Sequence, residues 1–438
     1  MKANPAAKAE LIVRGIGQLA TMAGPVGPRR GAAMGNAGLV SGGALAVGEG
    51  RILAAGPEAG VLAACRPAPD CQELDAGGAL VTPAYVDPHT HALFGRYRAD
   101  EFALRVAGVS YMEIAAAGGG IHASVADFRE RSDAELLALS RPRLMRMMLA
   151  GSATIEIKTG YGLDLEQELR ALRLIAALAE ELPATLVPTF LGAHEVPPAR
   201  RGDREAYVEE IVSEWLPAVA RQGIARFADV FCEPGVFTLD DSARILTAAQ
   251  QLGLGLKIHA DEIAAGYGGA ALGARLAAVS ADHLIVMAER DIAALAASPT
   301  VAVMLPATSL GLASTQFAPA RRLVDAGVAL ALATDYNPGS SCCESMGLVL
   351  SLACSALRLT PAEALCAATH NAAWACGEGE ATGSLLPGKR ADFILHDAAD
   401  LRELPYHLGF ASPRRVAARG RFLDFPAESL RDRSLAGA

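Results

Sequence analysis

Residues 153–194 read ATIEIKTGYGLDLEQELRALRLIAALAEELPATLVPTFLGAH, and this stretch decides the fold. The apolar run at 153–158 predicts a strand, and residues 163–182 carry apolar side chains at helical spacing. A second strand-like run follows at 185–193. A strand, a helix and a strand in this order are typical of a sheet whose strands are parallel.

The same alternation continues toward the C-terminus. Further strand-like runs stand in FADVFCE (227–233), GLKIHADE (255–262), AVSADHL (278–284), TVAVML (300–305) and ALALATDYN (329–337). Three helix starts pair a hydroxyl residue with a carboxylate three positions later, the pattern of a capping box. These pairs are Ser132 with Glu135, Thr238 with Asp241, and Thr360 with Glu363. About eight such units in roughly 300 residues predict an α/β protein with a closed (β/α)₈, TIM-like barrel. A doubly wound open sheet is the alternative, weakened because no G-x-G-x-x-G follows the first strand.

The two ends of the chain have a different pattern from this central block. Short apolar runs broken by glycine occur before residue 84, as in ALAVGEG (44–50), and again after residue 383, as in RVAARGRFLDF (415–425). Such runs predict short strands joined by turns. We therefore expect residues 1–83 and 384–438 to form the two parts of a small composite β-sandwich domain, and residues 84–383 to form the barrel.

Composition and charge exclude several classes of protein. Hydrophobic residues make up 52% of the chain and the net charge is −9, which opposes a broad nucleic-acid surface. No apolar run reaches the roughly 18 to 20 residues that cross a bilayer, and the N-terminus has no signal-peptide pattern. The eight cysteines are scattered without a C-x-x-C pair, so we expect free thiols and a cytoplasmic location.

Polar residues stand where the strand-like runs end. They are His89, His91, His194, His259, His283 and Asp335. In a barrel these strand ends all face one mouth, where catalytic sites are built. A single histidine at a strand end is more often structural. Five of the chain's nine histidines and an aspartate at such positions instead predict one site.

The H-x-H pair within YVDPHTH (85–91) suggests a metal centre. Residues i and i+2 of a strand face the same side, so His89 and His91 can reach one ion. With His259 and Asp335 they make a three-nitrogen, one-oxygen set that suits zinc or iron and leaves a position for water. Bound metal would make that water a nucleophile at neutral pH.

Three further side chains are candidates for roles around this centre. Glu262, three residues after His259, is placed to accept and return a proton, although a surface carboxylate is the bland alternative. His283 is a candidate for orienting the nucleophile. Lys158 raises the question of a carbamylated lysine between two metals, but it belongs to the wrong strand for a ligand adjacent to His259.

The motifs together resemble those of the amidohydrolase superfamily, whose members are metal-dependent hydrolases. Within it, the chain is most similar to the family of imidazolonepropionases, which open 4-imidazolone-5-propanoate to N-formimidoyl-L-glutamate in histidine degradation. The resemblance spans nearly the whole chain. It rests on segments such as VDPHTHALFGRYRADEFALR, EIKTGYGLDLEQELR, TFLGAHEVP, DVFCEPGVF, KIHADE and ATDYNPGSS.

The resemblance implies specific roles for residues of this chain. It assigns the metal, one Zn²⁺ or Fe³⁺ per subunit, to His89, His91, His259 and Asp335. It assigns substrate contacts to Arg98, Tyr111, Tyr161, His194, Glu262, Asn337, Gly339 and Ser340. Catalysis would fall to Glu262, His283 and Asp335, with Arg98 pairing with the propanoate. We also expect a homodimer.

Three segments depart from the family pattern: Ser309–Thr315, the pair Cys342 and Cys343, and His122. They are candidates for the border of the pocket, so they bear on which ring it accepts. Two other enzymatic readings remain open, namely ring opening of a hydantoin or thiohydantoin propanoate and deamination of a heterocycle. A non-catalytic scaffold is a further alternative, opposed by the complete ligand set.

Overall fold

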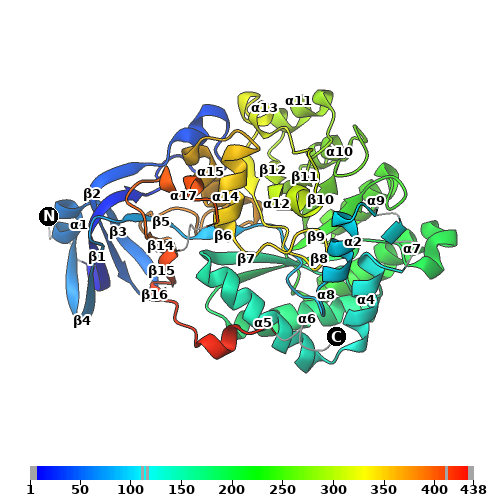
Figure 1. Cartoon of the computed structure of the whole chain (residues 1–438), viewed down its shortest axis with the longest axis horizontal. Helices are drawn as coiled ribbons and strands as arrows, with labels where there is room; N and C mark the ends of the chain where they lie inside the picture. The colour runs from blue at the N-terminus through cyan, green and yellow to red at the C-terminus, as the bar shows by residue number, and fades with distance from the viewer. Residues whose placement is uncertain (1–6, 110–112, 115–117, 410–412, 433–438) are drawn as a thin grey trace.

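Eight short parallel strands form one of the two sheets in the computed structural model (Figure 1). They are β6 (Tyr85–Asp87), β7 (Ser152–Lys158), β8 (Thr185–Ala193), β9 (Phe227–Cys232), β10 (Gly255–Ala260), β11 (Ser280–His283), β12 (Val301–Met304) and β13 (Leu330–Leu332). Each pairs with its neighbour in chain order, and an isolated parallel bridge between Thr90 and Tyr336 brings the two ends of the sheet together. The predicted (β/α)₈ barrel is confirmed. The structure describes residues 7–109, 113–114, 118–409 and 413–432.

Helices surround this barrel (Figure 1). They are α2 (Ala99–Val106), α4 (Ile121–Glu130), α5 (Asp133–Leu149), α6 (Leu165–Glu181), α7 (Arg204–Glu210), α8 (Leu216–Gln222), α9 (Leu239–Gln251), α10 (Gly269–Arg275), α11 (Glu289–Ala297), α12 (Pro306–Gly311), α13 (Ala320–Asp325), α14 (Met346–Ser355), α15 (Pro361–Ala368) and α16 (His370–Ala375). Nearly every residue of the barrel strands is buried, which explains their continuous apolar runs. None of the described helices combines the length and apolar character that a membrane span requires.

The three predicted capping boxes are present. The hydroxyl groups of Ser132, Thr238 and Thr360 accept the backbone N–H three residues on, at the starts of α5, α9 and α15. In each case the returning carboxylate accepts the backbone N–H of the capping residue. Each box therefore fixes where a helix begins and how the preceding barrel loop enters it.

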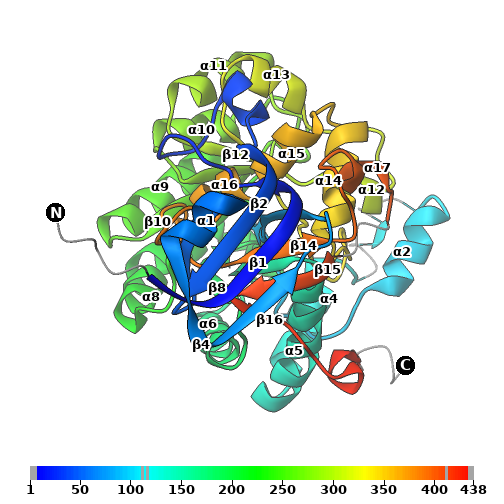
Figure 2. The ribbon, with the colours of Figure 1, turned by 90° about the vertical axis from the view of Figure 1, so that its left-hand side faces the viewer.

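Strands from both ends of the chain share the second sheet (Figure 2). Its strands are β1 (Ala7–Ala20), β2 (Leu39–Gly48), β3 (Arg51–Pro57), β4 (Cys65–Asp75), β5 (Leu80–Pro83), β14 (Phe393–His396), β15 (Pro413–Ala418) and β16 (Arg421–Phe422). The two parts meet where β5 pairs antiparallel with β14, with Pro83 opposite Phe393. The helices α1 (Glu58–Ala64) and α17 (Glu403–Tyr406) accompany these strands. The exact domain limits at 83/84 and 383/384 stay predictions.

The last described residues run back along α5 (Figure 2). There Asp432 pairs with the fully buried Arg143 at 2.8 Å. Arg143 also donates to the carbonyl oxygens of Phe94 and Gly95, at 2.5 and 2.6 Å. Through Arg143, Asp432 is thus linked to the segment that directly follows the H-x-H pair.

Candidate active site

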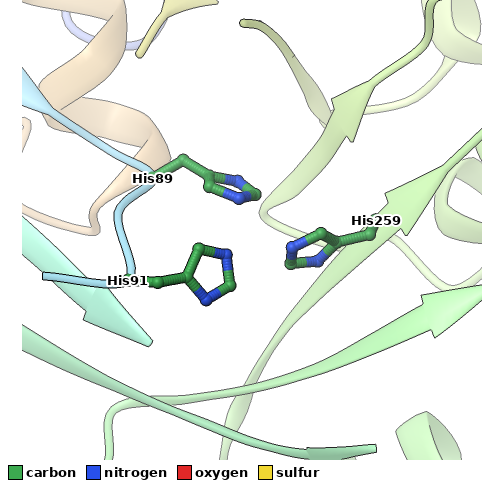
Figure 3. A group of neighbouring side chains, drawn as sticks. All are labelled: His89, His91 and His259. Carbon is green, nitrogen blue, oxygen red and sulfur yellow. The ribbon is translucent and has the colours of Figure 1, made fainter. Parts of the chain in front are cut away.

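Three histidines converge at the barrel mouth (Figure 3). His89 and His91 come from the segment after β6, and His259 from β10. One ring nitrogen of each lies within 4.8 Å of the others, and all three side chains are buried. The imidazole rings point toward a common centre, as the sequence predicts.

The local structure of the H-x-H pair differs from the prediction in one respect. Strand β6 ends at Asp87, before the pair, because Pro88 has no N–H to continue the ladder. Hydrogen bonds on both sides keep the following residues extended: Lys158 donates its backbone N–H to Thr90, and His91 donates to Tyr336. The two imidazoles therefore reach the same centre although they lie outside a regular strand.

Asp335 follows β13 and stands beside these histidines. Its Oδ1 lies 3.6 Å from His89 Nε2 and 3.7 Å from His91 Nε2. The hydroxyl of Thr308 donates to its other oxygen at 2.6 Å. Burial raises the pKa of the Asp335 carboxyl to about 6. Asp335 has a φ of 52°, a left-handed backbone that turns the side chain toward the histidines.

Two buried carboxylates stand behind the histidines. Asp282 Oδ2 lies 2.6 Å from His89 Nδ1, and Asp229 Oδ2 lies 3.1 Å from His259 Nδ1. The Nε2 atoms of both rings are buried without a hydrogen-bond partner among the described residues. A carboxylate on one ring nitrogen and an open second nitrogen are typical of metal-binding histidines. The residues present therefore fit a metal ion.

Lys158 belongs to the same buried cluster and acts as a cation in it. Its Nζ lies 2.7 Å from Asp229 and 3.5 Å from Asp282. Burial acts to lower the pKa of Lys158, but the neighbouring carboxylates outweigh burial and raise it. A lysine held between carboxylates in this way is protonated, which opposes the carbamylated-lysine hypothesis.

Burial favours the neutral form of three histidines around the centre. It lowers the pKa of His89, His91 and His283 well below the usual value, and the charge of Lys158 adds to this effect. Burial also lowers the pKa of His194 to about 3. Neutral imidazole is the form that ligates metals, so the electrostatics favour metal binding near neutral pH.

A cavity of about 460 Å³ opens above this centre. Among the predicted residues, those that line it are His91, Arg98, Tyr161, His194, His259, Glu262, His283, Asp335, Asn337 and Ser340. His89 lies behind them, fully buried, and Gly339 supports the wall. Tyr111 lies outside the described residues. The wall also contains residues that the sequence analysis did not single out, including Arg105, Phe231, Ile263, Ile285 and Gln316.

The cationic end of the cavity is built around Gly339. A Cβ at this glycine would overlap the Arg98 guanidinium, so only glycine leaves the arginine its place. Arg98 Nε lies 3.6 Å from Glu101, and its Nε and Nη1 atoms have no hydrogen-bond partner among the described residues. Arg105 donates to the Gly339 carbonyl at 2.8 Å. Two guanidinium groups thus border the same end of the cavity.

Asn337 organises the loop that carries Gly339 and Ser340. Its Oδ1 accepts the backbone N–H groups of both residues at 2.8 Å. Its Nδ2 donates to the Asp335 carbonyl and to the Ser340 hydroxyl, at 2.7 and 2.9 Å. The amide is therefore engaged within its own loop and fixes the neighbours of Asp335.

Tyr161 and His194 both line the cavity, with ring centroids 5.7 Å apart. Gly160, with a φ of 101°, brings its carbonyl to 2.9 Å from His194 Nδ1. A Cβ at Gly160 would stand 2.7 Å from that nitrogen, so the close approach requires glycine. The His194 ring stacks on His91 with centroids 5.0 Å apart. His194 is therefore held against the metal candidate His91.

Glu262 and His283 form a pair that lines the cavity. Glu262 Oε1 lies 3.6 Å from His283 Nδ1. Burial, then the charges of Asp335 and Glu233, raises the pKa of Glu262 well above its usual value. His283 has a φ of 77°, and the residue before Glu262, Asp261, has a φ of 50°. Such left-handed positions at non-glycine residues commonly mark functional sites.

Of the three departures from the family pattern, one contributes described residues to the lining of the cavity. Ser309, Leu312 and Ser314 line it. Cys342 is exposed and Cys343 packs against the barrel core. His122 Nε2 lies 3.0 Å from Arg201 Nη2, and His122 is not among the lining residues, although its neighbour Ile121 is. We expected all three departures to border the pocket. Of their described residues, only those in Ser309–Thr315 line it, and the expectation for the other two departures is corrected.

Comparison with known proteins assigns the family. The sequence profile of the amidohydrolase family matches residues 80–421. The chain belongs to this family. Among its relatives, the imidazolonepropionase of Symbiobacterium thermophilum is 50% identical over 94% of this chain and 97% of its own length. That of Solibacter usitatus is 46% identical over 90% of this chain and 93% of its own.

Solved amidohydrolase structures agree on the fold. A zinc-bound adenosine deaminase from Xanthomonas campestris matches with a TM-score of 0.73 and 20% identity, over 99% of this chain and 98% of its own. The guanine deaminase of E. coli matches with a TM-score of 0.68 and 15% identity, over 94% and 98%. At these identities the likeness concerns the architecture alone.

Proposed function

We propose that this amidohydrolase is an imidazolonepropionase, which adds water to 4-imidazolone-5-propanoate and opens its ring to N-formimidoyl-L-glutamate. One observation carries the proposal: a histidine cluster fit for a metal and a nearly buried arginine lie at the same small cavity, in a chain 50% identical to an imidazolonepropionase. A ring carbonyl and a carboxylate tail are the two chemical groups that such a cavity would hold.

We assign the metal to His89, His91, His259 and Asp335. Zn²⁺ and Fe³⁺ both suit three imidazoles and one carboxylate. When bound, the ion supplies Lewis acidity, which polarises a carbonyl and lowers the pKa of a water molecule from about 16 to about 7. Asp282 and Asp229 keep the His89 and His259 rings in the orientation that ligation needs.

Arg98 binds the propanoate in this proposal. It lines the cavity, it is nearly buried, and Glu101 at 3.6 Å is the carboxylate closest to it among the described ion pairs. A guanidinium in such a place favours a charge-assisted bond to a carboxylate. Fixing the tail sets the position of the ring at the histidines, which turns part of the binding energy into orientation. Tyr161, His194 and the loop of Ser340 would complete the contacts.

Glu262 and His283 handle the proton. The raised pKa of Glu262 makes its ionised carboxylate a stronger base, which suits a group that accepts a proton and then returns it. Glu262 would accept a proton from the attacking water and pass it to the ring nitrogen as the carbon–nitrogen bond breaks. His283, 3.6 Å from Glu262, would orient that water.

The experiment that tests this function is product analysis. Purified protein with 4-imidazolone-5-propanoate should yield a product heavier than the substrate by one water molecule, without release of ammonia. Ammonia release would favour the deaminase alternative. Conversion of hydantoin propanoate alone would favour the related ring. A cytoplasmic location and a homodimer also remain proposals; size-exclusion chromatography with light scattering tests the latter.

A further inference from the structure

Glu233, directly after β9 in the motif DVFCEPGVF, is a buried carboxylate that the proposed chemistry does not use. It is 1% exposed and is not among the residues that line the cavity. Its oxygens accept three consecutive backbone N–H groups. Oε1 accepts from Glu262 at 2.7 Å and from Ile263 at 3.0 Å, and Oε2 accepts from Ala264 at 3.0 Å.

These three bonds hold the turn that presents Glu262 to the cavity. The turn follows β10, where Asp261 adopts a left-handed φ of 50°. Asp261 fixes the far side of the loop, because its carboxylate accepts the backbone N–H groups of Gly268 and Ala270 at 2.9 and 2.8 Å. Glu233 fixes the near side from a neighbouring strand. The backbone of Glu262 is thus fixed by two buried carboxylates.

We propose that Glu233 is a positioning residue for proton transfer by Glu262. The inference rests on the proposed function, since it assigns Glu233 a role through the Glu262 carboxyl. In this proposal, the Glu262 carboxyl faces His283 only while the backbone N–H of Glu262 is hydrogen-bonded to the Glu233 carboxylate. A shift of about 1 Å in a catalytic group is enough to cost about 100-fold in rate. Loosening this turn should therefore slow the chemical step more than it weakens substrate binding.

The chain contains a matched control. Glu168 on α6 is also a buried carboxylate that accepts three loop N–H groups, those of Gly160, Gly162 and Leu163, at 3.1, 2.8 and 2.9 Å. Its loop carries Tyr161, a candidate substrate contact rather than a proton carrier. The same substitution in both carboxylates removes a similar set of bonds from two loops with different proposed roles.

The test compares Glu233→Gln with Glu168→Gln in the metal-loaded protein. Glutamine keeps the length of the side chain but replaces one acceptor oxygen with an amide that faces a backbone N–H. We expect Glu233→Gln to lower kcat by about 10- to 100-fold with KM within about threefold of the wild type. We expect Glu168→Gln to change mainly KM. Metal content and thermal midpoint are measured for both variants.

Two outcomes overturn the inference: wild-type kcat in Glu233→Gln, with or without a rise in KM, or equal kinetic losses in both variants. Glu233→Asp, which keeps the charge but withdraws both oxygens from the turn, should reproduce the loss of kcat. If neither Glu233 variant folds, Glu233 is structural and the inference is wrong. If the wild type turns over only hydantoin propanoate, the proposed function fails, and the same comparison on that substrate still tests Glu233.

Discussion

The side chain of Arg98 shows how a single residue defines one end of a cavity. Its guanidinium lies where a side chain on Gly339 would stand, and its backbone N–H donates to the Pro338 carbonyl at 2.9 Å. The loop after β13 therefore contains both Asp335 and the residues that contact Arg98, namely Pro338 and Gly339. This shared loop links the place where a ring would react with the place where its anionic tail would bind.

Replacing Arg98 with methionine should raise KM for 4-imidazolone-5-propanoate by about 10- to 100-fold. The reason is the loss of one charge-assisted hydrogen bond, which is worth about 1.5 to 3 kcal/mol. Arg96→Met is the control, because Arg96 is 64% exposed and contacts Asp127 on the surface. Steady-state kinetics measure both. An unchanged KM in Arg98→Met would contradict the assigned role.

Replacing Asp282 with asparagine should weaken metal binding by about 10- to 100-fold, the usual cost of losing the partner of a metal-binding histidine. The asparagine amide offers a donor where His89 Nδ1 now faces a carboxylate oxygen. Competition with a chromogenic chelator measures the affinity. Asp291→Asn, another buried aspartate outside the cluster, is the control. Equal affinities for both variants would show that Asp282 does not orient His89.

At the scale of residues, the sequence allowed the histidines and Asp335 to be predicted as one cluster, because parallel strands of a barrel end at one mouth. It did not lead to Asp229, Asp282 or Glu233. The available signal was a charged residue inside an apolar strand, as in SADH. Such a residue is buried only when partners from other strands satisfy it, and spacing along one strand does not reveal those partners.

The loops at the barrel mouth share a way of being held in place. Three loops carry candidate site residues, and in each of them a buried side chain accepts backbone N–H groups; these side chains are Glu168, Glu233 and Asn337. The capping boxes of α5, α9 and α15 could be predicted because the signal is local, a hydroxyl and a carboxylate three residues apart. The end of β6 could not, because alternation within YVDPHTH does not reveal that the strand stops before Pro88.

The pairing of β5 with β14 has a pH-dependent element. Burial lowers the pKa of His396, at the end of β14, to about 3, and its Nε2 lies 2.8 Å from the Thr82 hydroxyl of β5. In the unfolded chain this histidine binds a proton below a pH of about 6.5, whereas the folded protein does not bind it until a pH of about 3. The unfolded state is therefore increasingly favoured as the pH falls through this window.

His396→Gln should accordingly lose less stability than the wild type between pH 7 and pH 5. The difference should be about 1 to 2 kcal/mol, from about 1.4 kcal/mol for each pH unit below 6.5. Thermal unfolding at both pH values measures it. His407→Gln, at an exposed position, should keep the acid sensitivity of the wild type. If His396→Gln lost as much stability between pH 7 and pH 5 as the wild type, His396 would be excluded as the source of the acid sensitivity.

The whole molecule joins its ends in two places. The strands after residue 392 complete the sheet that β1 begins, and Asp432 reaches Arg143, which holds the carbonyls of Phe94 and Gly95 after the H-x-H pair. The composite domain could be predicted because both ends share a pattern of short apolar runs and glycines. The contact between Asp432 and Arg143 could not be predicted, because it joins residues 289 positions apart and has no local signal in the sequence.

The central claim is that a metal at the histidine cluster is needed to open the ring of 4-imidazolone-5-propanoate. The direct measurement follows the ultraviolet absorbance of this compound with protein as purified, after chelation, and after one equivalent of Zn²⁺ or Fe³⁺ is restored. We predict decay far above the spontaneous rate, its loss with the chelator and its return with the metal. Spontaneous decay alone with metal-loaded protein, or full activity after complete metal removal, would contradict it.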